Sequence, residues 1–376
     1  MVAGEASGDL LGGLLLGGLK TRWPRLQAAG IGGPRMVAQG FEAWWPHDKL
    51  SVSGYVEVLS RYREISGIRR RLTERLLHAE ASERADVFVG IDAPDFNLDL
   101  EARLKAQGMK AIHFVSPSIW AWRGQRIEKI RRATDLVLCL FPFEPAIYAN
   151  QGVAAAYVGH PLADVIPIEV PRAGARSSLG IADDETVVAL LPGSRRAEVQ
   201  HIAPRLLQAA AEMHRQRRGL RFVLPVVPGL RQLVEPLCRR HAPDLAIDLL
   251  DGRSHEALAA CDVTLIASGT ATLEAALFKR PMVITYVMHA LNWQIMKRMN
   301  YQPWVGLPNI LLNEFAVPEL LQGAATPAAL ARAAFDWLAD PVRCEALRAR
   351  FEVLHRELRC NTAVAATDAI EKVLAL

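Results

Sequence analysis

The sequence predicts an α/β protein with two domains, each built on a doubly wound parallel sheet. The chain has 376 residues, of which 51% are hydrophobic and 22% charged. At about 100 to 200 residues per domain, this length suits two domains with cores of their own. Short apolar runs alternate with helical patterns along the chain, and this alternation is typical of parallel sheets covered by helices.

Eight apolar runs are rich in Val, Ile and Leu and show no polar alternation, as expected of strands that are buried on both faces. The predicted strands are residues 87–91, 111–115 and 136–141 in the first half, and 187–191, 222–227, 245–250, 263–267 and 282–287 in the second. Helical patterns such as 202–217 and 272–278 lie between them.

A stretch rich in proline, 161–180, has no sustained helical period and is the predicted linker. We therefore expect domains at 1–163 and 164–345. A helical segment, 346–376, packs back on the first domain or is exchanged in a dimer. Only three residues precede the first glycine-rich loop, which predicts either a shortened first strand or a native start upstream of Met1.

The composition and the absence of certain motifs argue against several classes of function. The five cysteines are widely spaced without a C-x-x-C pair, which indicates a reducing, cytosolic compartment and no cysteine metal site. No apolar run approaches the ~18 residues of a membrane span, so membrane contact is expected to be peripheral. The net charge of +4 is too small to indicate nucleic acid. No pattern indicates a metal, a P-loop or a serine hydrolase, and we expect no cofactor.

Four loops each follow a predicted strand and open a helix, at the carboxyl edge where parallel sheets bind ligands. They are residues 4–9, 90–97, 190–196 and 267–274.

In the first loop, Ser7, Gly8 and Asp9 are candidates for the acceptor-side loop, where glycines allow close approach of the backbone and the helix N-terminus favours an anion; the alternative is a tight turn capped by Ser7 or Asp9. In the second, Asp92 is placed to act as a general base on a sugar hydroxyl; the alternative is a cap for the helix that Pro94 starts.

The third loop offers the N–H groups of Gly193 and Ser194 and the guanidinium of Arg195 to a diphosphate. The alternative is a solvated arginine beside a glycine turn.

The fourth loop offers Ser268, Gly269 and Thr270 as phosphate donors and Glu274 as an acceptor for ribose hydroxyls. The alternative is a helix N-terminus with a favourably placed glutamate.

The stretch 56–76 combines a helical apolar period with many arginines, which predicts either a lipid-contacting face or an ordinary core-facing helix with a solvated basic side. The candidate lipid contacts are Val56, Val58, Leu59, Tyr62, Ile65 and Ile68. Ser116 and Trp120 are candidates for the acceptor site, with core packing as the alternative for Trp120. His160 is expected to be structural.

At these motifs the chain resembles the bacterial lipid-A-disaccharide synthases. GEASGD, VGIDAPDFN and LPGSR together are specific for that family. The matching pieces run in order over nearly the whole chain: 2–9, 32–36, 87–97, 115–122, 133–143, 190–199, 265–274, 307–309 and 359–361.

The resemblance implies a GT-B fold, with two Rossmann-like domains facing a cleft. It implies an inverting hexosyltransferase that joins UDP-2,3-diacylglucosamine to 2,3-diacylglucosamine 1-phosphate, giving a β-1′,6-linked disaccharide 1-phosphate and UDP in lipopolysaccharide biosynthesis. Asp92 matches the family's proposed base and Glu5 its essential loop acid. Arg195, Asn309 and Glu274 match nucleotide-side residues.

The resemblance also implies peripheral contact of the 56–68 region with the cytoplasmic face of the inner membrane, and a homodimer with exchanged C-terminal segments. Two other functions remain open from the residues. One is a different GT-B enzyme acting on a UDP-sugar, such as an epimerase or a peptidoglycan-type transferase. The other is a non-catalytic module that binds a nucleotide sugar or a membrane.

Overall fold

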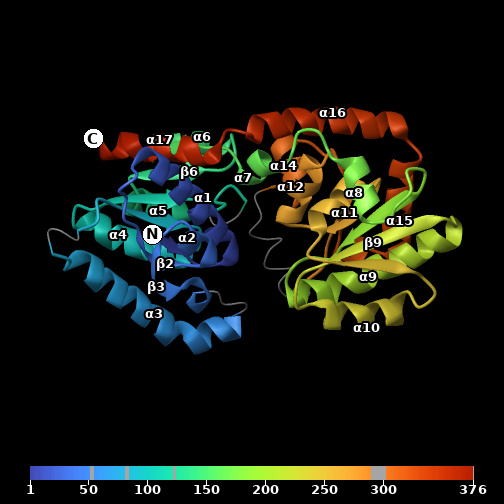
Figure 1. Cartoon of the computed structure of the whole chain (residues 1–376), viewed down its shortest axis with the longest axis horizontal. Helices are drawn as coiled ribbons and strands as arrows, with labels where there is room; N and C mark the ends of the chain where they lie inside the picture. Colours follow the sequence, from blue (N-terminus) through green and yellow to red (C-terminus); the bar gives the residue numbers. More distant parts are fainter. Residues whose placement is uncertain (51–54, 81–83, 122–123, 289–301, 376) are drawn as a thin grey trace. The chain divides into compact units, whose positions relative to one another are not determined.

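The computed structural model describes residues 1–50, 55–80, 84–121, 124–288 and 302–375. The chain forms two compact units (Figure 1). Unit 1 comprises Met1–Asp164 together with Glu357–Leu376, and unit 2 comprises Val165–Arg356. Each unit is built around one sheet in which the paired strands run parallel, which confirms the predicted α/β class.

Unit 1 has a seven-stranded sheet in the order β3-β2-β1-β4-β5-β6-β7. Its strands are β1 (Val2–Ala3), β2 (Ala29–Gly32), β3 (Glu42–Pro46), β4 (Val87–Ile91), β5 (Lys110–Phe114), β6 (Leu136–Cys139) and β7 (Ala155–Tyr157). Its helices are α1 (Ala6–Arg22), α2 (Pro34–Ala38), α3 (Tyr55–Leu77), α4 (Pro94–Ala106), α5 (Arg126–Ala133), α6 (Glu144–Ala149) and α17 (Thr362–Leu374), and α7 (Pro161–Val165) crosses into unit 2.

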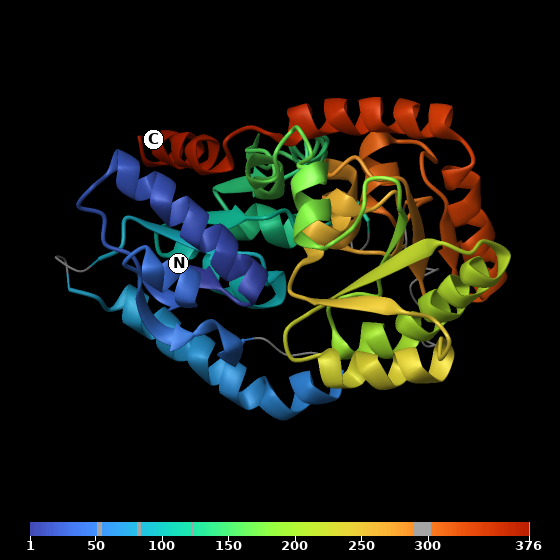
Figure 2. The same cartoon turned by 45° about the vertical axis from the view of Figure 1, so that its right-hand side comes forward.

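Side chains alternate between the two faces along each strand of the unit 1 sheet. Each face is covered by helices, so neighbouring residues of one strand belong to different cores. Val2 and Phe88 pack with α3 and α4, whereas Ala3 and Val89 pack with α1 and α17. The C-terminal helix α17 lies alongside α1 in both views of the fold (Figures 1 and 2), and Arg22 pairs with Asp368 at 2.6 Å. The last helix is therefore part of the unit 1 core.

Unit 2 has a six-stranded sheet in the order β10-β9-β8-β11-β12-β13. Its strands are β8 (Thr186–Leu191), β9 (Leu220–Val226), β10 (Ile247–Asp251), β11 (Val263–Ala267), β12 (Met282–Tyr286) and β13 (Glu319–Leu321). Its helices are α8 (Arg172–Ser178), α9 (Arg196–Gln216), α10 (Arg231–His241), α11 (Ser254–Ala260), α12 (Thr270–Leu277), α14 (Leu307–Leu312), α15 (Pro327–Leu338) and α16 (Pro341–Leu358).

Two expectations about the chain's organisation need correction. The stretch 161–180 is not an irregular linker, because it contains the short helices α7 and α8. Residues 346–356 belong to unit 2, because Phe351 and Leu354 of α16 are buried there, and the chain returns to unit 1 only at Glu357. No helix in the described part of the chain is long and apolar enough to cross a membrane.

The strand orders place a topological switch point in each sheet. In unit 1 the chain winds outward in opposite directions from β1 and β4, and in unit 2 from β8 and β11. The loops that leave these strands therefore diverge at the carboxyl edge, which opens a crevice where ligands bind in such sheets. The four candidate loops are those that follow these four strands.

Asp9 ties the first of these loops to a second helix. It is 2% exposed, and its Oδ1 accepts hydrogen bonds from the N–H groups of Gly33 at 2.8 Å and Met36 at 3.1 Å. Its Oδ2 accepts from Arg35 N at 2.9 Å. Asp9 thus caps α2 rather than its own helix, and its carboxylate is fully used in holding α1 and α2 together.

We predict that Asp9→Ala destabilises the protein by about 2 to 3 kcal/mol, because two buried N–H groups and one partly buried N–H group lose a charged acceptor. The urea midpoint measures the change. Asp368→Ala is the matched control: it removes a carboxylate of unit 1 whose ion pair with Arg22 is exposed, and it should cost less than about 1 kcal/mol. Equal losses for the two variants would contradict this role of Asp9.

Candidate functional site

The unit 1 switch point brings two of the predicted residues to one sheet edge. Glu5 is exposed and is the N-cap residue of α1, directly after β1. Asp92 follows the neighbouring strand β4. The two loops touch, because a Cβ added to Gly4 would lie 2.8 Å from the Cβ of Ala93. Because Gly4 has no side chain, the loop that carries Glu5 can lie directly against the loop that carries Asp92.

The Asp92 loop has a strained backbone. Asp92 and Ala93 both adopt left-handed conformations, with φ of 51° and 43°. Such conformations cost about 1 to 3 kcal/mol each in a non-glycine residue, and they persist only where neighbouring groups hold them. Here Asp92 N donates to Phe114 O at 2.9 Å, and Asn97 Nδ2 donates to Asp92 O at 2.8 Å.

The Asp92 side chain does not cap helix α4. The N-terminus of α4 has no side-chain cap hydrogen bond, so the alternative of Asp92 as a helix cap is wrong. Among the described residues, the structure gives the Asp92 carboxylate no hydrogen-bond partner. A half-buried, uncommitted carboxylate at a switch point is available to accept a proton from a ligand.

Asn97 is a functional-loop residue that the motif contained but whose role the sequence did not reveal. It is fully buried, and its Nδ2 also lies 3.3 Å from Val2 O and 3.4 Å from Ile91 O. It therefore links the ends of β1 and β4. Beneath it, Glu101 Oε1 and His113 Nδ1 form a fully buried pair at 2.8 Å.

Ser116 and Trp120 lie in the interior rather than on a binding surface. The Ser116 hydroxyl is 2.8 Å from Tyr148 Oη, and Trp120 Nε1 donates to Glu144 at 2.9 Å. Trp120 also packs edge-on against Phe143, with ring centroids 5.3 Å apart. Both side chains are buried and have partners in unit 1, which favours the core-packing alternative for Trp120; contact with the acceptor stays a prediction.

His160 is structural, as expected. It is buried, its Nδ1 accepts from Leu162 N at 3.2 Å, and its ring stacks on Phe141. Burial lowers the pKa of His160 to about 4.

The unit 2 switch point holds a cavity of about 460 Å³. Seven of the predicted nucleotide-side residues line it: Gly193, Ser194, Arg195, Ser268, Gly269, Thr270 and Glu274. The sequence did not indicate the other walls, which come from the ends of β9 and β10: Pro225, Val226, Val227, Pro228, Gly252 and Ser254. Residues from four strand ends thus form one concave site.

The two helix starts in this cavity differ. At α9, Glu198 Oε2 accepts from Ser194 N and Arg195 N at 3.3 Å each, so these N–H groups are already used. At α12, the N-cap residue is Gly269 and no side chain caps the helix. The N–H group of Ser194 is thus bonded within the protein, whereas the N-terminus of α12 has no side-chain cap, so α12 is the better candidate end for an anion.

Asn309 does not line this cavity but supports one of its loops through hydrogen bonds. It is fully buried, its Nδ2 donates to Glu319 Oε1 at 2.8 Å, and Glu319 Oε2 accepts from Val305 N at 2.9 Å. Val305 O in turn accepts from the Ser268 hydroxyl at 2.8 Å. Its amide thus holds the Ser268 loop in this structure, and direct nucleotide contact by Asn309 stays a prediction.

Helix α3 is continuous over Tyr55–Leu77, and its second half packs against the core of unit 1. Ile68 is 1% exposed and packs with Leu72 and Phe96, and Ile65 packs against the same core. Ile68 is therefore a core residue and not a lipid contact. The side chains of Val56, Val58, Leu59 and Tyr62 lie outside the described residues.

Comparison with known proteins identifies the family. A family model described as lipid-A-disaccharide synthetase matches residues 1–370. The chain belongs to the lipid-A-disaccharide synthetase family. A lipid-A-disaccharide synthase of Albidiferax ferrireducens is 58% identical over 379 residues, covering 100% of this chain and 96% of the relative. One of Verminephrobacter eiseniae is 53% identical, covering 100% and 97%.

Solved structures show the fold of this family member. MurG of Acinetobacter baumannii aligns with a TM-score of 0.59 and 16% identity, covering 97% of this chain and 96% of that chain. UDP-GlcNAc 2-epimerase of Neisseria meningitidis, bound to UDP-GlcNAc, aligns with a TM-score of 0.62 and 9% identity, covering 98% and 96%. The predicted GT-B fold and the glycosyltransferase class of lipid A biosynthesis are confirmed.

The buried carboxyl beside Trp120 gives the family member a pH-dependent stability. Burial raises the pKa of Glu144 from 4.5 to about 7. Between these values the unfolded chain has released a proton that the folded protein still holds, so this group's contribution to stability falls as pH rises and is constant above about 7.

We predict that Glu144→Gln reduces the fall in urea midpoint between pH 5 and pH 7 relative to the wild type. Midpoints measured across pH 5 to 8 test this, and Glu42→Gln, which changes an exposed glutamate of unit 1, should keep the wild-type profile. Parallel profiles for Glu144→Gln and wild type would show that this carboxyl does not titrate in the range.

Proposed function

We propose that the chain transfers 2,3-diacylglucosamine from UDP to 2,3-diacylglucosamine 1-phosphate, giving the β-1′,6-linked disaccharide 1-phosphate and UDP. The observation that carries the proposal is the unit 2 cavity, which gathers seven predicted nucleotide-side residues at a switch point. Relatives more than half identical over the whole chain bear the name of this activity.

In the proposed complex UDP occupies the unit 2 cavity. The diphosphate lies at the uncapped N-terminus of α12, where N–H groups and the helix dipole favour an anion. Arg195 is 67% exposed along its side chain and paired at 3.6 Å with Glu198, so it is free to turn toward the diphosphate. Glu274 lines the same cavity and accepts from the ribose hydroxyls.

Asp92 is the proposed general base. It takes the proton from the acceptor's 6-hydroxyl, the oxygen attacks the anomeric carbon of the donor, and the bond from that carbon to the UDP oxygen breaks with inversion. Charge grows on the departing UDP, and Arg195 with α12 stabilises it more in the transition state than in the ground state. Glu5, beside the Asp92 loop, is the proposed essential acid on the acceptor side.

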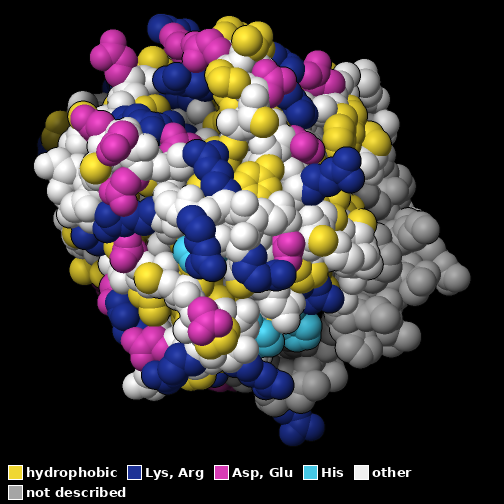
Figure 3. Space-filling view, turned by 90° about the vertical axis from the view of Figure 1, so that its right-hand side faces the viewer, with side chains coloured by type: hydrophobic (Ala, Val, Ile, Leu, Met, Phe, Trp, Pro, Cys, Tyr) yellow, Lys and Arg dark blue, Asp and Glu magenta, His cyan; other side chains and the backbone are white. Residues whose placement is uncertain are grey.

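We further propose peripheral contact with the cytoplasmic face of the inner membrane through the first half of α3, where Val56, Val58, Leu59 and Tyr62 lie next to arginines in the sequence. On the face shown in Figure 3, charged side chains of both signs are interspersed, which does not favour lipid binding there. A homodimer remains a proposal from the family resemblance, with α17 packed on α1 of its own chain in the monomer.

We predict that Asp92→Asn lowers kcat about 10²- to 10⁴-fold, as expected for loss of a general base, with UDP affinity nearly unchanged. UDP release with both diacylated substrates, each omitted in turn, measures turnover, and calorimetry measures UDP binding. Asp95→Asn is the matched control, because Asp95 lies three residues further on, in the first turn of α4, and is exposed and paired with Arg126. A near-wild-type rate for Asp92→Asn would remove the base assignment.

We predict that Arg195→Ala weakens UDP binding about 10- to 100-fold and lowers turnover as well, because a charge-assisted contact to the diphosphate is lost. Arg196→Ala is the control: Arg196 is the next residue and exposed, but it does not line the cavity. Unchanged UDP affinity in Arg195→Ala would mean that the nucleotide does not reach this side of the cavity.

A further inference from the structure

Unit 2 has a second cavity, of about 350 Å³, at the opposite edge of its sheet from the UDP cavity. Thr186 begins β8, Asp262 immediately precedes β11 and Pro281 immediately precedes β12, and all three line this cavity. It therefore opens at the amino ends of the strands, away from the switch-point loops.

Cationic side chains converge on this second cavity from four segments that are far apart in the sequence. They are Arg172, Arg217, Arg280 and Arg348. Lys279 also lines the cavity, but its Nζ bonds elsewhere, to Ile168 O at 2.7 Å and to His355 Nδ1 at 2.7 Å. Such convergence concentrates positive potential in a concave site, where low-dielectric walls strengthen it.

Arg280 is the buried member of the set. It is 5% exposed, its Nη2 donates to Ala259 O at 2.8 Å, and its Nε is buried without a hydrogen-bond partner. Within the described residues the structure gives it no ion pair with a carboxylate. Burial, with smaller effects from Arg172 and Arg348, lowers the pKa of Arg280. A desolvated guanidinium without a counter-charge is costly, and an anion in the cavity would offset that cost.

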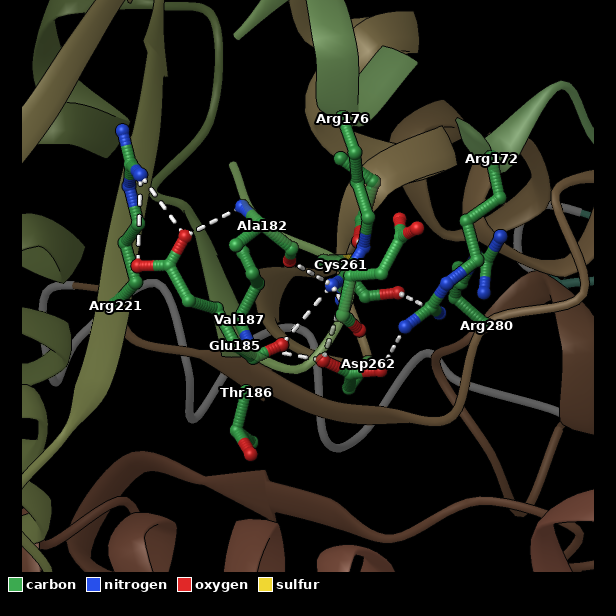
Figure 4. A network of polar contacts seen from close by, with 12 residues as sticks. Arg172, Arg176, Ala182, Glu185, Thr186, Val187, Arg221, Cys261, Asp262 and Arg280 are labelled. Atoms are coloured by element: carbon green, nitrogen blue, oxygen red, sulfur yellow. Dashed lines mark hydrogen bonds and ion pairs between the residues drawn. The ribbon is translucent and has the colours of Figure 1, made fainter. Parts of the chain in front are cut away.

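The nearby carboxylate is already shared. Asp262 Oδ1 accepts from Arg172 at 2.6 Å, and its Oδ2 accepts from Arg176 at 3.0 Å and from Val187 N at 2.8 Å (Figure 4). One negative charge therefore serves two guanidinium groups before Arg280 is counted.

The other acids of the lining do not neutralise Arg280. Glu185 accepts from Ala182 N at 2.7 Å and from Arg221 at 3.2 Å, and Figure 4 shows it on the side of the network away from Arg280. Asp183 and Asp184 lie on an exposed turn, where water screens them. The inner part of the cavity thus keeps an excess of positive charge.

We propose that this second cavity binds a phosphate-type oxyanion, either inorganic phosphate or a phosphate monoester, between Arg280, Arg172 and Arg348. The guanidinium groups of Arg280 and Arg172 supply donors from the wall. Arg348 on α16, whose partner at 3.1 Å is the exposed Glu345, closes over the anion from outside. The cavity is large enough for the monoester group beyond the phosphate.

The test measures Tm of the full-length protein against inorganic phosphate or glucose 1-phosphate, at fixed pH and with sodium chloride at equal ionic strength as the baseline. Saturating UDP is present throughout, so that phosphate cannot act through the first cavity. Binding to the folded state raises Tm in proportion to the logarithm of ligand concentration once the site is filled. Comparison of the two ligands tells whether the free ion or the ester is preferred.

The matched variants are Arg348→Gln and Arg215→Gln. Both arginines are exposed and form i,i+3 pairs with a glutamate, but Arg215 does not line the cavity. We expect phosphate to raise Tm in wild type and Arg215→Gln, and Arg348→Gln to shift the dose–response about tenfold to weaker binding. Arg280→Gln should abolish the rise in Tm caused by phosphate. If the Arg280→Gln protein does not fold, Arg172→Gln is tested in its place.

Two results would overturn the proposal. One is a wild-type Tm that phosphate and glucose 1-phosphate leave unchanged. The other is a dose–response in Arg348→Gln that coincides with that of Arg215→Gln. The UDP-release rate of Arg348→Gln should stay at the wild-type value, which separates this site from the proposed catalytic one.

Discussion

The geometry at the switch points is the constraint on which the rest of the molecule depends. In a parallel sheet, loops from neighbouring strands diverge only where the winding direction reverses, and only there does the carboxyl edge stay open to a ligand. Both sheets have one such reversal, at β1/β4 and at β8/β11. The loops that carry Glu5, Asp92, Arg195 and Ser268 follow those four strands, so the topology alone selects which segments meet a substrate.

A switch point provides a crevice, but buried polar side chains give its loops their shape. Asp9 fixes the start of α1 to α2, Asn97 holds the left-handed turn at Asp92, and Asn309 holds the Ser268 loop through Glu319. Each places a charged or amide group in the interior, where its hydrogen bonds offset much of the cost of burial, although Asn97 Oδ1 has no partner among the described residues. Motifs of this family therefore contain two kinds of residue: those that face the cavity or crevice and those that hold the first kind in position.

The sequence predicted the fold well because buried parallel strands leave a local signal, a run of apolar residues. The eight strands predicted from such runs all occur, within a few residues at their ends. The misses were elements without that signal, including the short helices α7 and α8 and the half-exposed strands β3 and β13. Positions within the motifs were predictable, but roles were not: Ile68, Trp120 and Asn309 are distinguished from surface residues only by partners outside their own motifs.

The two edges of the unit 2 sheet attract anions by different physical means, and the difference suits different lifetimes of binding. In the proposed complex, the partial charge of the α12 N-terminus and an exposed arginine hold the ligand at the carboxyl edge, so a departing diphosphate meets little reorganisation and can leave. At the amino edge, Arg280 is desolvated and has no carboxylate partner in the described part of the chain. An anion bound there offsets the free-energy cost of burying the Arg280 guanidinium, and that cost returns when the anion leaves. The first arrangement serves turnover, and the second serves a resident ligand that stabilises the domain.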